Sequence, residues 1–402
     1  MKSIKKIKDG TICTPLGFKT NAINCGIKND KLDLALIYSI VKAKAAGVFT
    51  ANKVKAAPVL LDIANLKNNV AQAIIVNSGN ANCCTGKRGY ADAQAVGRKV
   101  ADVLEVKQAD VLVASTGIIG KYLPKDKIID SIELLARGLE FDKADKTACA
   151  MMTTDSFPKQ VAVEFKIAEK KVSIAAVAKG AGMICPNMAT MLCFVTTDAN
   201  ISVSGLKKAL KIAADNSFNC ISVDGDMSTN DTLAILANGL AGNALIKDKG
   251  KNFDLFVQAL SEICLELAKM IVIDGEGATK LIEINVQGAK TKQQAKQAAS
   301  QIANSLLVKT MIAGENPNWG RIPASVGAAG IDFKEDKLEV FLQNIPVYRK
   351  LTPDTKNREK LIKLLAKKQI NITVKLNNGK FSYTIWGNDL TKEYVKINTE
   401  YN

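Results

Sequence analysis

The sequence predicts an α/β fold followed by a smaller C-terminal α+β unit, and three observations support this class. Short buried strands alternate with helical patterns and glycine-rich loops in the first half. Longer apolar patterns with helical spacing follow. The last third combines an alternating strand, an alanine-rich segment and an Asn-Asn-Gly turn. For a chain of 402 residues we therefore expect a large domain over 1–280 and a small unit over 281–402.

The individual elements follow from the spacing of apolar residues. Short apolar or alternating runs predict strands at 73–76, 111–114, 161–167, 172–177, 191–195, 281–286, 372–376 and 381–386. Apolar residues at i, i+3 and i+4 predict helices at 90–104, 206–218, 256–271, 293–311 and 358–368. Two of the strand pairs are expected to form hairpins, one around the turn Ala-Glu-Lys-Lys and one around Asn377-Asn378-Gly379.

The cysteines and the apolar runs bear on the compartment. No run approaches the roughly 18 apolar residues of a membrane span, and the N-terminal residues lack the apolar core of a secretory signal. The nine cysteines are odd in number and none forms a C-x-x-C pair. These features predict reduced thiols in a reducing cytoplasm, and they argue against a metal site.

Histidine is absent, which excludes a Ser-His-Asp or Cys-His arrangement within this chain. The net charge is +16, and a positive charge of this size suits a protein that binds nucleic acid. Only six of the 55 basic residues are arginine, however, and aromatic residues make up only 5%. This composition favours a lysine-rich solvated surface, and a basic nucleic-acid-binding protein remains an alternative of another class.

Two motif-like segments do not meet the requirements of the sites that they resemble. GNANCCTGK (79–87) has the wrong spacing for a phosphate-binding Walker A loop. DGDMSTND (224–231) lacks the central glycine of a calcium loop and has Ile235 where the bidentate glutamate belongs. We expect the second segment to be a carboxylate-rich, hydrogen-bonded turn.

The segment KGAGMICPNMATML (179–192) places Thr190 directly before an apolar strand. On spacing alone, an ordinary loop that ends in a β-favouring threonine is the simpler interpretation. The alternative is an N-terminal nucleophile, whose hydroxyl cleaves the preceding peptide bond and whose freed α-amine then serves as general base. The reference pKa of that amine, about 8, suits a chain without histidine.

The segment STGIIG (115–120) follows a buried strand and also has two interpretations. It is either a tight turn that requires glycine, or an oxyanion hole. In the second case the Gly117 N–H and the Thr116 hydroxyl would stabilise a tetrahedral intermediate.

These motifs are part of a wider resemblance. Nine blocks occur in the family's order: GVFTANKVKAAPV (47–59), NSGNANCCTGKRG (77–89), STGIIG (115–120), MTTDSFPK (152–159), KGAGMICPNMATMLCF (179–194), SFNCISVDGDMSTNDT (217–232), DGEGATK (274–280), NPNWGRI (316–322) and YVKIN (394–398). The sequence is identified as a member of the ornithine acetyltransferase family, also called glutamate N-acetyltransferase, which acts in arginine biosynthesis.

The resemblance implies a fold and a set of site residues. The fold is a layered α/β sandwich of the N-terminal-nucleophile-like kind, assembled from two copies of each of two fragments. The nucleophile matches Thr190 and self-cleavage falls between Ala189 and Thr190, which gives fragments 1–189 and 190–402. The oxyanion pair matches Thr116 and Gly117. The substrate-contacting positions match Thr153, Lys179, Thr190, Glu276 and Asn398.

The resemblance also implies a reaction. Acetyl moves from N2-acetyl-L-ornithine to L-glutamate through an acetyl-threonine intermediate, without metal or cofactor. Lys179 is a partner for a substrate carboxylate and Glu276 for the ornithine ammonium, and the unit 281–402 closes the site. Some members also use acetyl-CoA, and no position here decides that point. We expect a cytoplasmic enzyme that binds neither nucleic acid nor membrane.

Four departures and one rival remain. The block that usually reads DGDT has Met227, and the block that usually reads DPNWGR has Glu315 and Asn316 before Pro317. Cys83 precedes Cys84 where the family usually has a single cysteine. The Ser or Thr that usually follows the Asn398 position by five residues has no counterpart, because the sequence ends at Asn402. The rival is a threonine-nucleophile aminopeptidase or amidase on a related fold, which would release the acyl group to water.

Overall fold

The computed structural model describes residues 4–142, 144–185 and 191–400. The chain divides into two compact units. The first comprises Met1–Gly180, Asn187–Asn219 and Met227–Ala268. The second comprises Ala181–Pro186, Cys220–Asp226 and Lys269–Asn402, so most of it comes from the C-terminal third of the chain.

A single mixed sheet forms the centre of the first unit. In the described part of this unit it has nine strands in the order β1-β6-β7-β8-β10-β3-β4-β5, and β2 pairs with β3. The strands are β1 (Ile4–Lys6), β2 (Phe18–Ile23), β3 (Leu34–Phe49), β4 (Val70–Asn80), β5 (Val111–Ile118), β6 (Lys159–Ile167), β7 (Lys170–Lys179), β8 (Leu192–Thr197) and β10 (Thr232–Ala237). Most pairs are antiparallel, but β4 with β5 and β8 with β10 are parallel.

The long strand β3 connects two halves of this sheet. Its first part pairs with β2 and β4, and its last part pairs with β10. The pairing of β3 with β4 shifts register between Tyr38 and Ala43. Side chains from β4 and β5 share one buried cluster with side chains from β7, β8 and β10. The two halves therefore pack face to face around a common core.

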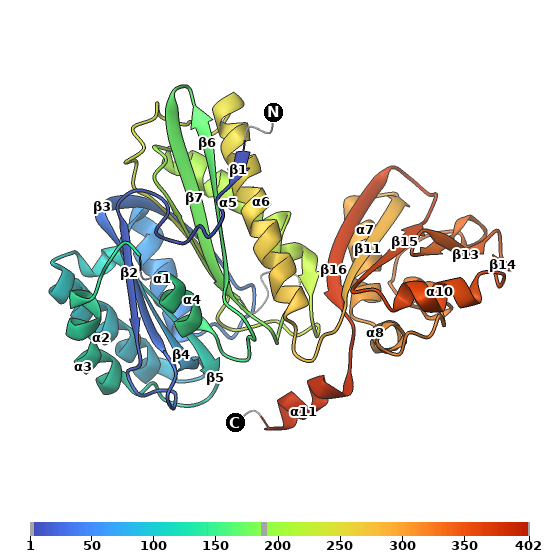
Figure 1. Ribbon diagram of the computed structural model, residues 1–402, viewed down its shortest axis with the longest axis horizontal. Coiled ribbons are helices and arrows are strands. Elements are labelled where there is room, and N and C mark those ends of the chain that lie inside the picture. The colour runs from blue at the N-terminus through green and yellow to red at the C-terminus, as the bar shows by residue number, and fades with distance from the viewer. Residues whose placement is uncertain (1–3, 143, 186–190, 401–402) are drawn as a thin grey trace. The chain divides into compact units, whose positions relative to one another are not determined.

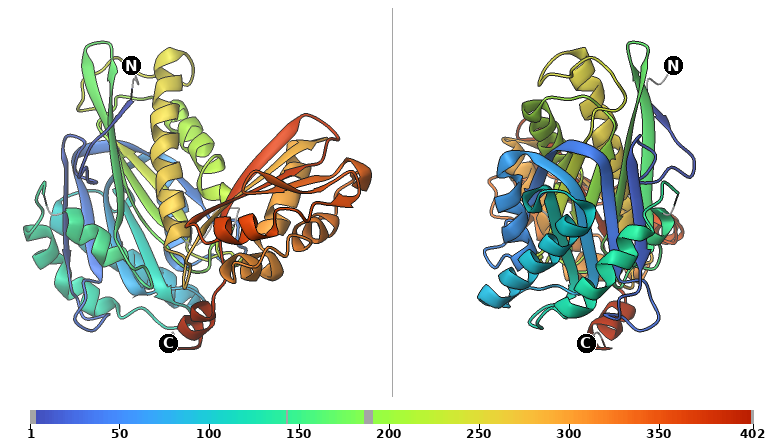
Figure 2. Two further views of the ribbon diagram at one scale, coloured as in Figure 1. Left: turned by 45° about the vertical axis from the view of Figure 1, so that its right-hand side comes forward. Right: turned by 90° about the vertical axis from the view of Figure 1, so that its left-hand side faces the viewer.

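Helices cover the outer faces of these two halves, except for the helix Ala144–Met151, whose buried residues belong to the shared core (Figures 1 and 2). The helices of this unit are α1 (Ala57–Asn65), α2 (Gly86–Leu104), α3 (Lys125–Arg137), α4 (Ala144–Met151), α5 (Val203–Asp215) and α6 (Lys251–Ile273), of which α6 continues into the second unit. In β4, Ile75 packs against α1, α2 and α3, while Ile74 faces the shared core. This alternation is the two-residue period of a strand that is buried on both faces.

The second unit is a separate sheet with helices on one face. In its described part the order is β14-β13-β12-β15-β11-β16-β9. The strands are β9 (Ile221–Ser222), β11 (Leu281–Ala289), β12 (Glu339–Leu342), β13 (Ile345–Arg349), β14 (Thr352–Pro353), β15 (Gln369–Lys375) and β16 (Phe381–Asn388). The helices are α7 (Lys292–Ala303), α8 (Leu306–Ala313), α9 (Arg321–Gly327), α10 (Arg358–Leu365) and α11 (Lys392–Glu400). Helices α7 to α10 bury their apolar sides against alternate strand residues.

The α/β prediction is confirmed, and so is the smaller α+β unit. Each strand and helix predicted from spacing has a counterpart, usually longer than predicted. The predicted helix 293–311 is two helices, because Ser305 caps the start of α8 by accepting a hydrogen bond from the Val308 N–H at 3.3 Å. The expected hairpin of β6 and β7 is present.

The hairpin predicted around Asn377-Asn378-Gly379 is wrong. Strands β15 and β16 both pair with β11, which lies between them, parallel to one and antiparallel to the other. The connecting turn crosses the end of β11, where the Asn378 N–H donates to the Gly288 carbonyl at 2.7 Å. A turn motif identifies a local reversal, but a distant strand decides what pairs with the two flanking segments.

Candidate active site

The predicted oxyanion pair lies at the carboxyl end of β5. Thr116 is buried, and Gly117 is paired with Gly79 at the end of β4. Gly117 has a φ of +130°, and a Cβ added there would come within 2.4 Å of the Gly79 carbonyl carbon. Only glycine permits this approach of two backbones, so the local structure explains why the segment requires glycine after Thr116.

Lys179, the last residue of β7, connects the oxyanion strand to the loop before β6. Its ammonium donates to the Thr153 Oγ1 at 2.8 Å and to the Thr116 Oγ1 at 3.2 Å. The structure thus brings together three of the predicted residues from segments far apart in the sequence. Because the Thr116 oxygen accepts from a cation, its own O–H becomes a stronger hydrogen-bond donor.

A buried carboxylate that the sequence analysis did not assign stabilises this arrangement. The Asp155 Oδ1 accepts from the Lys159 ammonium and from the Gly180 N–H, both at 2.7 Å, and its Oδ2 accepts from the Thr153 N–H at 3.0 Å. Burial opposes ionisation of Asp155, but the charges of Lys179 and Lys159 outweigh it and lower the pKa to about 2. Asp155 therefore fixes the loop that carries Thr153 and the backbone that follows Lys179.

Glu276 and Asn398 are neighbours within the second unit. The Asn398 side-chain N–H donates to the Glu276 Oε2 at 2.8 Å. The Glu276 N–H donates to the Ala181 carbonyl at 2.9 Å. A Cβ on Gly182 would lie 2.5 Å from the Glu276 carboxylate, so glycine at 182 leaves the space that this side chain fills. The half-buried carboxylate of Glu276 is thus held in place by the amide of Asn398.

The predicted nucleophile Thr190 and the cleavage position Ala189 lie outside the described residues. The next residue, Met191, is described, and its N–H donates to the Oδ1 of Asp231 at 3.0 Å. Asp231 is fully buried, and burial raises its pKa well above the usual range. This carboxyl group therefore fixes the start of β8 immediately after Thr190.

The segment DGDMSTND forms the hydrogen-bonded, carboxylate-rich structure that its composition predicts. Besides the contact of Asp231, the carboxylate of Asp224 accepts from the Met183 N–H at 2.6 Å and from the Ile184 N–H at 2.9 Å. Over residues 4–142, 144–185 and 191–400, no group of three or more Cys, Asp or Glu residues is arranged to hold a metal ion.

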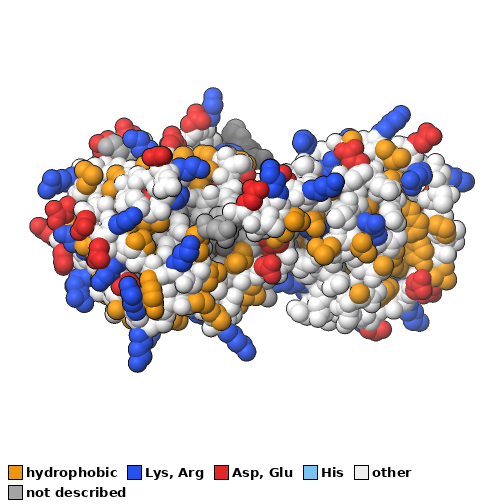
Figure 3. Space-filling model, turned by 90° about the horizontal axis from the view of Figure 1, so that it is seen from below, with side chains coloured by type: hydrophobic (Ala, Val, Ile, Leu, Met, Phe, Trp, Pro, Cys, Tyr) orange, Lys and Arg blue, Asp and Glu red, His pale blue; other side chains and the backbone are white. Residues whose placement is uncertain are grey.

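The surface charge has no single dominant patch on the face shown in Figure 3. Lys and Arg side chains are spread over it and alternate with Asp and Glu side chains. All nine cysteines, which are among the described residues, are thiols rather than disulfides. In the part of the chain that the structure describes, no helix has both the length and the apolar character needed to cross a membrane.

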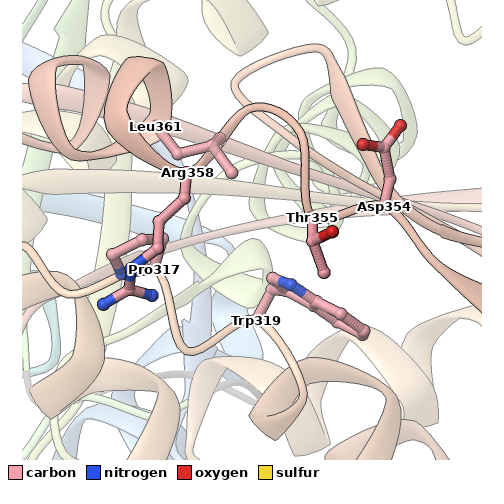
Figure 4. A pocket seen from close by; sticks show the side chains of 6 residues that line it. All are labelled: Pro317, Trp319, Asp354, Thr355, Arg358 and Leu361. Carbon is pink, nitrogen blue, oxygen red and sulfur yellow. The ribbon is translucent and has the colours of Figure 1, made fainter.

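Two pockets among the described residues of the second unit contain none of the predicted residues, and Figure 4 shows the smaller one. It has a volume of about 80 Å³ and is lined by Pro317, Trp319, Asp354, Thr355, Arg358 and Leu361. In Figure 4 the Arg358 guanidinium extends past Pro317, and the Trp319 indole forms one wall below Thr355. Nothing in its lining resembles the hydroxyl and ammonium arrangement around Thr116.

Comparisons with known proteins identify relatives along the whole chain. A family model described as the ArgJ family matches residues 19–402. The chain is 49% identical over 400 residues to the arginine biosynthesis bifunctional protein ArgJ of Caldanaerobacter subterraneus, a match that covers 98% of this chain and 99% of the relative. It is 46% identical over 412 residues to a glutamate N-acetyltransferase of Methanococcus maripaludis, with 98% of each chain covered.

Among solved structures, the chain is similar to an ornithine acetyltransferase from Mycobacterium tuberculosis that is complexed with ornithine. The identity is 37% and the TM-score is 0.43, over 46% of this chain and 98% of that chain.

Proposed function

The chain belongs to the ArgJ family, and from this premise we propose that it transfers the acetyl group of N2-acetyl-L-ornithine to L-glutamate. The protein is an enzyme, an acetyltransferase of arginine biosynthesis, like the relatives that match it over their full length. The observation that carries the proposal is the contact of the Lys179 ammonium with the hydroxyl of Thr116 beside Gly117. This arrangement supplies oxyanion donors without histidine.

The proposed first step forms the acetyl-enzyme. The Thr190 α-amine takes the proton of its own hydroxyl as Oγ attacks the acetyl carbonyl carbon. The Thr116 hydroxyl and the Gly117 N–H hold the oxyanion, and each such donor contributes about 3–4 kcal/mol to transition-state stabilisation. The carbon–nitrogen bond to ornithine then breaks, the proton passes from the amine to the leaving nitrogen, and acetyl-Thr190 remains.

The proposed second step reverses these roles for glutamate. Its α-amine attacks the ester carbonyl carbon and passes a proton to the Thr190 amine. The carbon–oxygen bond to Thr190 breaks, and the released Oγ takes that proton. Because threonine carries the acetyl group, this reaction requires no metal and no organic cofactor. We propose acetyl-CoA only as a second acetyl donor.

Two amino acids with a common α-carboxylate and different side chains must use one site. We propose that the Lys179 ammonium binds the carboxylate and that Thr153 contributes a hydroxyl. Glu276, with Asn398 beside it, is the proposed partner of the ornithine side-chain ammonium. The charge of Glu276 would distinguish ornithine from glutamate, because the two substrates differ at their side-chain ends.

The nucleophile requires self-processing in this proposal. The Thr190 Oγ attacks the Ala189 carbonyl, the acyl group shifts from nitrogen to oxygen, and water hydrolyses the ester. The products are fragments 1–189 and 190–402, and we propose that two copies of each assemble. The thiol form of all nine cysteines supports a reducing cytoplasm as the place of the reaction.

Mass spectrometry under denaturing conditions tests the nucleophile, and a labelled-acetyl assay tests the reaction. We expect two fragments, the second beginning with Thr190, and transfer of label from N2-acetylornithine to glutamate. A Thr190→Ala variant should remain a single chain without transfer. Release of acetate from N2-acetylornithine at the same rate with and without glutamate would instead identify an amidase.

A further inference from the structure

The loop between β2 and β3 holds Lys28 in a defined position. The carboxylate of Asp33, which is fully buried, accepts from the backbone N–H groups of Cys25 and Ile27 at 2.7 Å and of Lys28 at 2.9 Å. The Asn24 side chain adds a hydrogen bond to the Lys28 carbonyl at 3.0 Å. This internal bonding makes the loop a rigid support for the Lys28 side chain.

The Lys28 side chain lies at the edge of the oxyanion strand. A Cβ on Gly79 would come within 3.2 Å of the Lys28 Cγ, and Gly79 is the register partner of Gly117. The Lys28 ammonium donates to the Met152 carbonyl at 2.7 Å. Thr153, the next residue, is the one that Lys179 contacts. The two ammonium groups therefore attach to adjacent residues of one loop.

Lysine ammonium groups gather around this position. Those of Lys28, Lys159 and Lys179 interact with the carboxylates of Asp33 and Asp155, and Lys179 also interacts with the buried Asp231, whose pKa burial raises well above its usual range. Both carboxylates already accept from backbone N–H groups, and that of Asp155 also pairs with Lys159. The Lys28 ammonium is half-buried and donates to a neutral carbonyl, that of Met152, and such a cation favours binding of an anion.

The pKa of Lys28 reflects the same environment. Burial lowers it most, the charges of Lys179 and Lys31 lower it further, and Asp33 and Asp155 oppose the change, which leaves the pKa at about 8. Lys28 is therefore protonated at neutral pH and loses its charge as the pH rises past about 8.

We propose that Lys28 is a second anion-binding residue of the acetyl-transfer site, which binds, together with Lys179, the α-carboxylate common to N2-acetylornithine and glutamate. This inference rests on the proposed function and adds a substrate contact to it. A phosphate of acetyl-CoA is the other anion that the same ammonium would attract, so the experiment must separate the two.

Single-turnover acylation of processed enzyme without glutamate tests the contact. The variants are Lys28→Gln and Lys28→Arg, with Lys31→Gln as the matched control, because Lys31 is an exposed lysine of the same loop. The donors are N2-acetylornithine, N-acetylputrescine, which is the same molecule without its carboxylate, and acetyl-CoA. The readout is acetyl bound to the fragment that begins with Thr190, and thermal unfolding verifies that each variant is folded.

We expect Lys28→Gln to lower kcat/KM for N2-acetylornithine by about 10- to 100-fold, the effect of losing a charge-assisted hydrogen bond. With N-acetylputrescine the same variant should match the wild type within about twofold. Lys28→Arg should retain most activity, and Lys31→Gln should match the wild type. Equal losses of kcat/KM with N2-acetylornithine and N-acetylputrescine, or a loss confined to acetyl-CoA, would overturn the carboxylate assignment. A wild type acetylated by no donor would overturn the proposed function as well.

The pH profile is a readout that a purely structural role would not change. Acylation by N2-acetylornithine should decline above about pH 8 in the wild type, as Lys28 loses its proton. Because arginine stays protonated, Lys28→Arg should move this decline to higher pH. An unchanged decline in Lys28→Arg would show that another group causes it and that the proposal is wrong.

Discussion

Replacing Thr116 is the clearest way to distinguish an effect on the chemical step from an effect on folding. Its hydroxyl oxygen accepts from Lys179, and in the proposed mechanism its proton binds the oxyanion. We expect Thr116→Ala to lower kcat by about 10²- to 10³-fold, the usual cost of losing one oxyanion donor. Thr116→Ser keeps the hydroxyl and should stay within about tenfold of the wild type. Steady-state kinetics measure both, and a Thr116→Ala enzyme with unchanged kcat would exclude this role.

Asp155 contributes to stability through its ion pair with Lys159. Removing one partner of a buried pair leaves an uncompensated charge, so Asp155→Ala should lower the free energy of unfolding by about 3–5 kcal/mol. The native pKa of about 2 lies below the unfolded value of about 3.9, so ionisation stabilises the protein above about pH 4. This contribution is lost as the pH falls toward 2.

Urea unfolding of wild type and Asp155→Ala between pH 7 and pH 3 measures that difference. The gap between the two proteins should narrow at the acid end. A gap that widens as the pH falls would mean that the carboxyl group stabilises the protein in its protonated form.

For individual site residues, the sequence predicted roles only where the family resemblance provided them. Thr116, Thr153 and Lys179 are identified by matching blocks, and the structure brings them together. Lys28 has no signal of its own, because it is one of 49 lysines, and Asp155 lies in the matched block MTTDSFPK, where nothing distinguishes it from its neighbours. Their positions depend on the approach of β4, β7 and the 152–158 loop, which no local pattern encodes.

At the scale of elements, the turn over the end of β11 makes a sharp prediction. A Cβ on Gly379 would lie 2.2 Å from the Ala289 carbonyl oxygen, which is backbone and cannot move aside cheaply. We expect Gly379→Ala to destabilise the protein by about 1–3 kcal/mol, the usual cost of overpacking. Gly320→Ala is the matched control, because a Cβ added at Gly320 would meet no neighbouring atom within 4 Å. Thermal unfolding measures the stability of both variants. Equal melting temperatures for Gly379→Ala and Gly320→Ala would contradict this account.

Elements defined by local spacing were predictable, and elements defined by distant partners were not. The run at 73–76 predicts β4 because its residues are buried on both faces, a property that the composition records directly. The Asn-Asn-Gly turn predicts a hairpin only if no third strand intervenes, and β11 does intervene. The pairing of β3 with β4 contains a register shift between Tyr38 and Ala43, and no apolar pattern in the sequence predicts it.

At the scale of the whole molecule, the sheet of the first unit combines both proposed fragments. Strands β8 and β10 belong to fragment 190–402 and lie between β7 and β3, which belong to fragment 1–189. Once the chain is cut, refolding from urea must bring two molecules together. We expect the refolding rate of the processed protein to rise with protein concentration, whereas Thr190→Ala should refold at a rate independent of concentration.

Circular dichroism at two protein concentrations distinguishes these cases. Equal refolding rates for the processed protein at both concentrations would mean that one fragment folds without the other, contrary to the interleaved strand order.

The interleaved strands also determine the order in which folding and the proposed cut occur. If the chain cuts itself before Thr190 as proposed, we expect β7 to pair with β8 while the chain is still continuous, before the cut. A new N-terminus at residue 190 would then be a permanent record that a given molecule completed its fold, even if it later unfolds. The proportion of cut chains on a denaturing gel would therefore measure the fraction of molecules that had folded in a living cell, without any assay of activity.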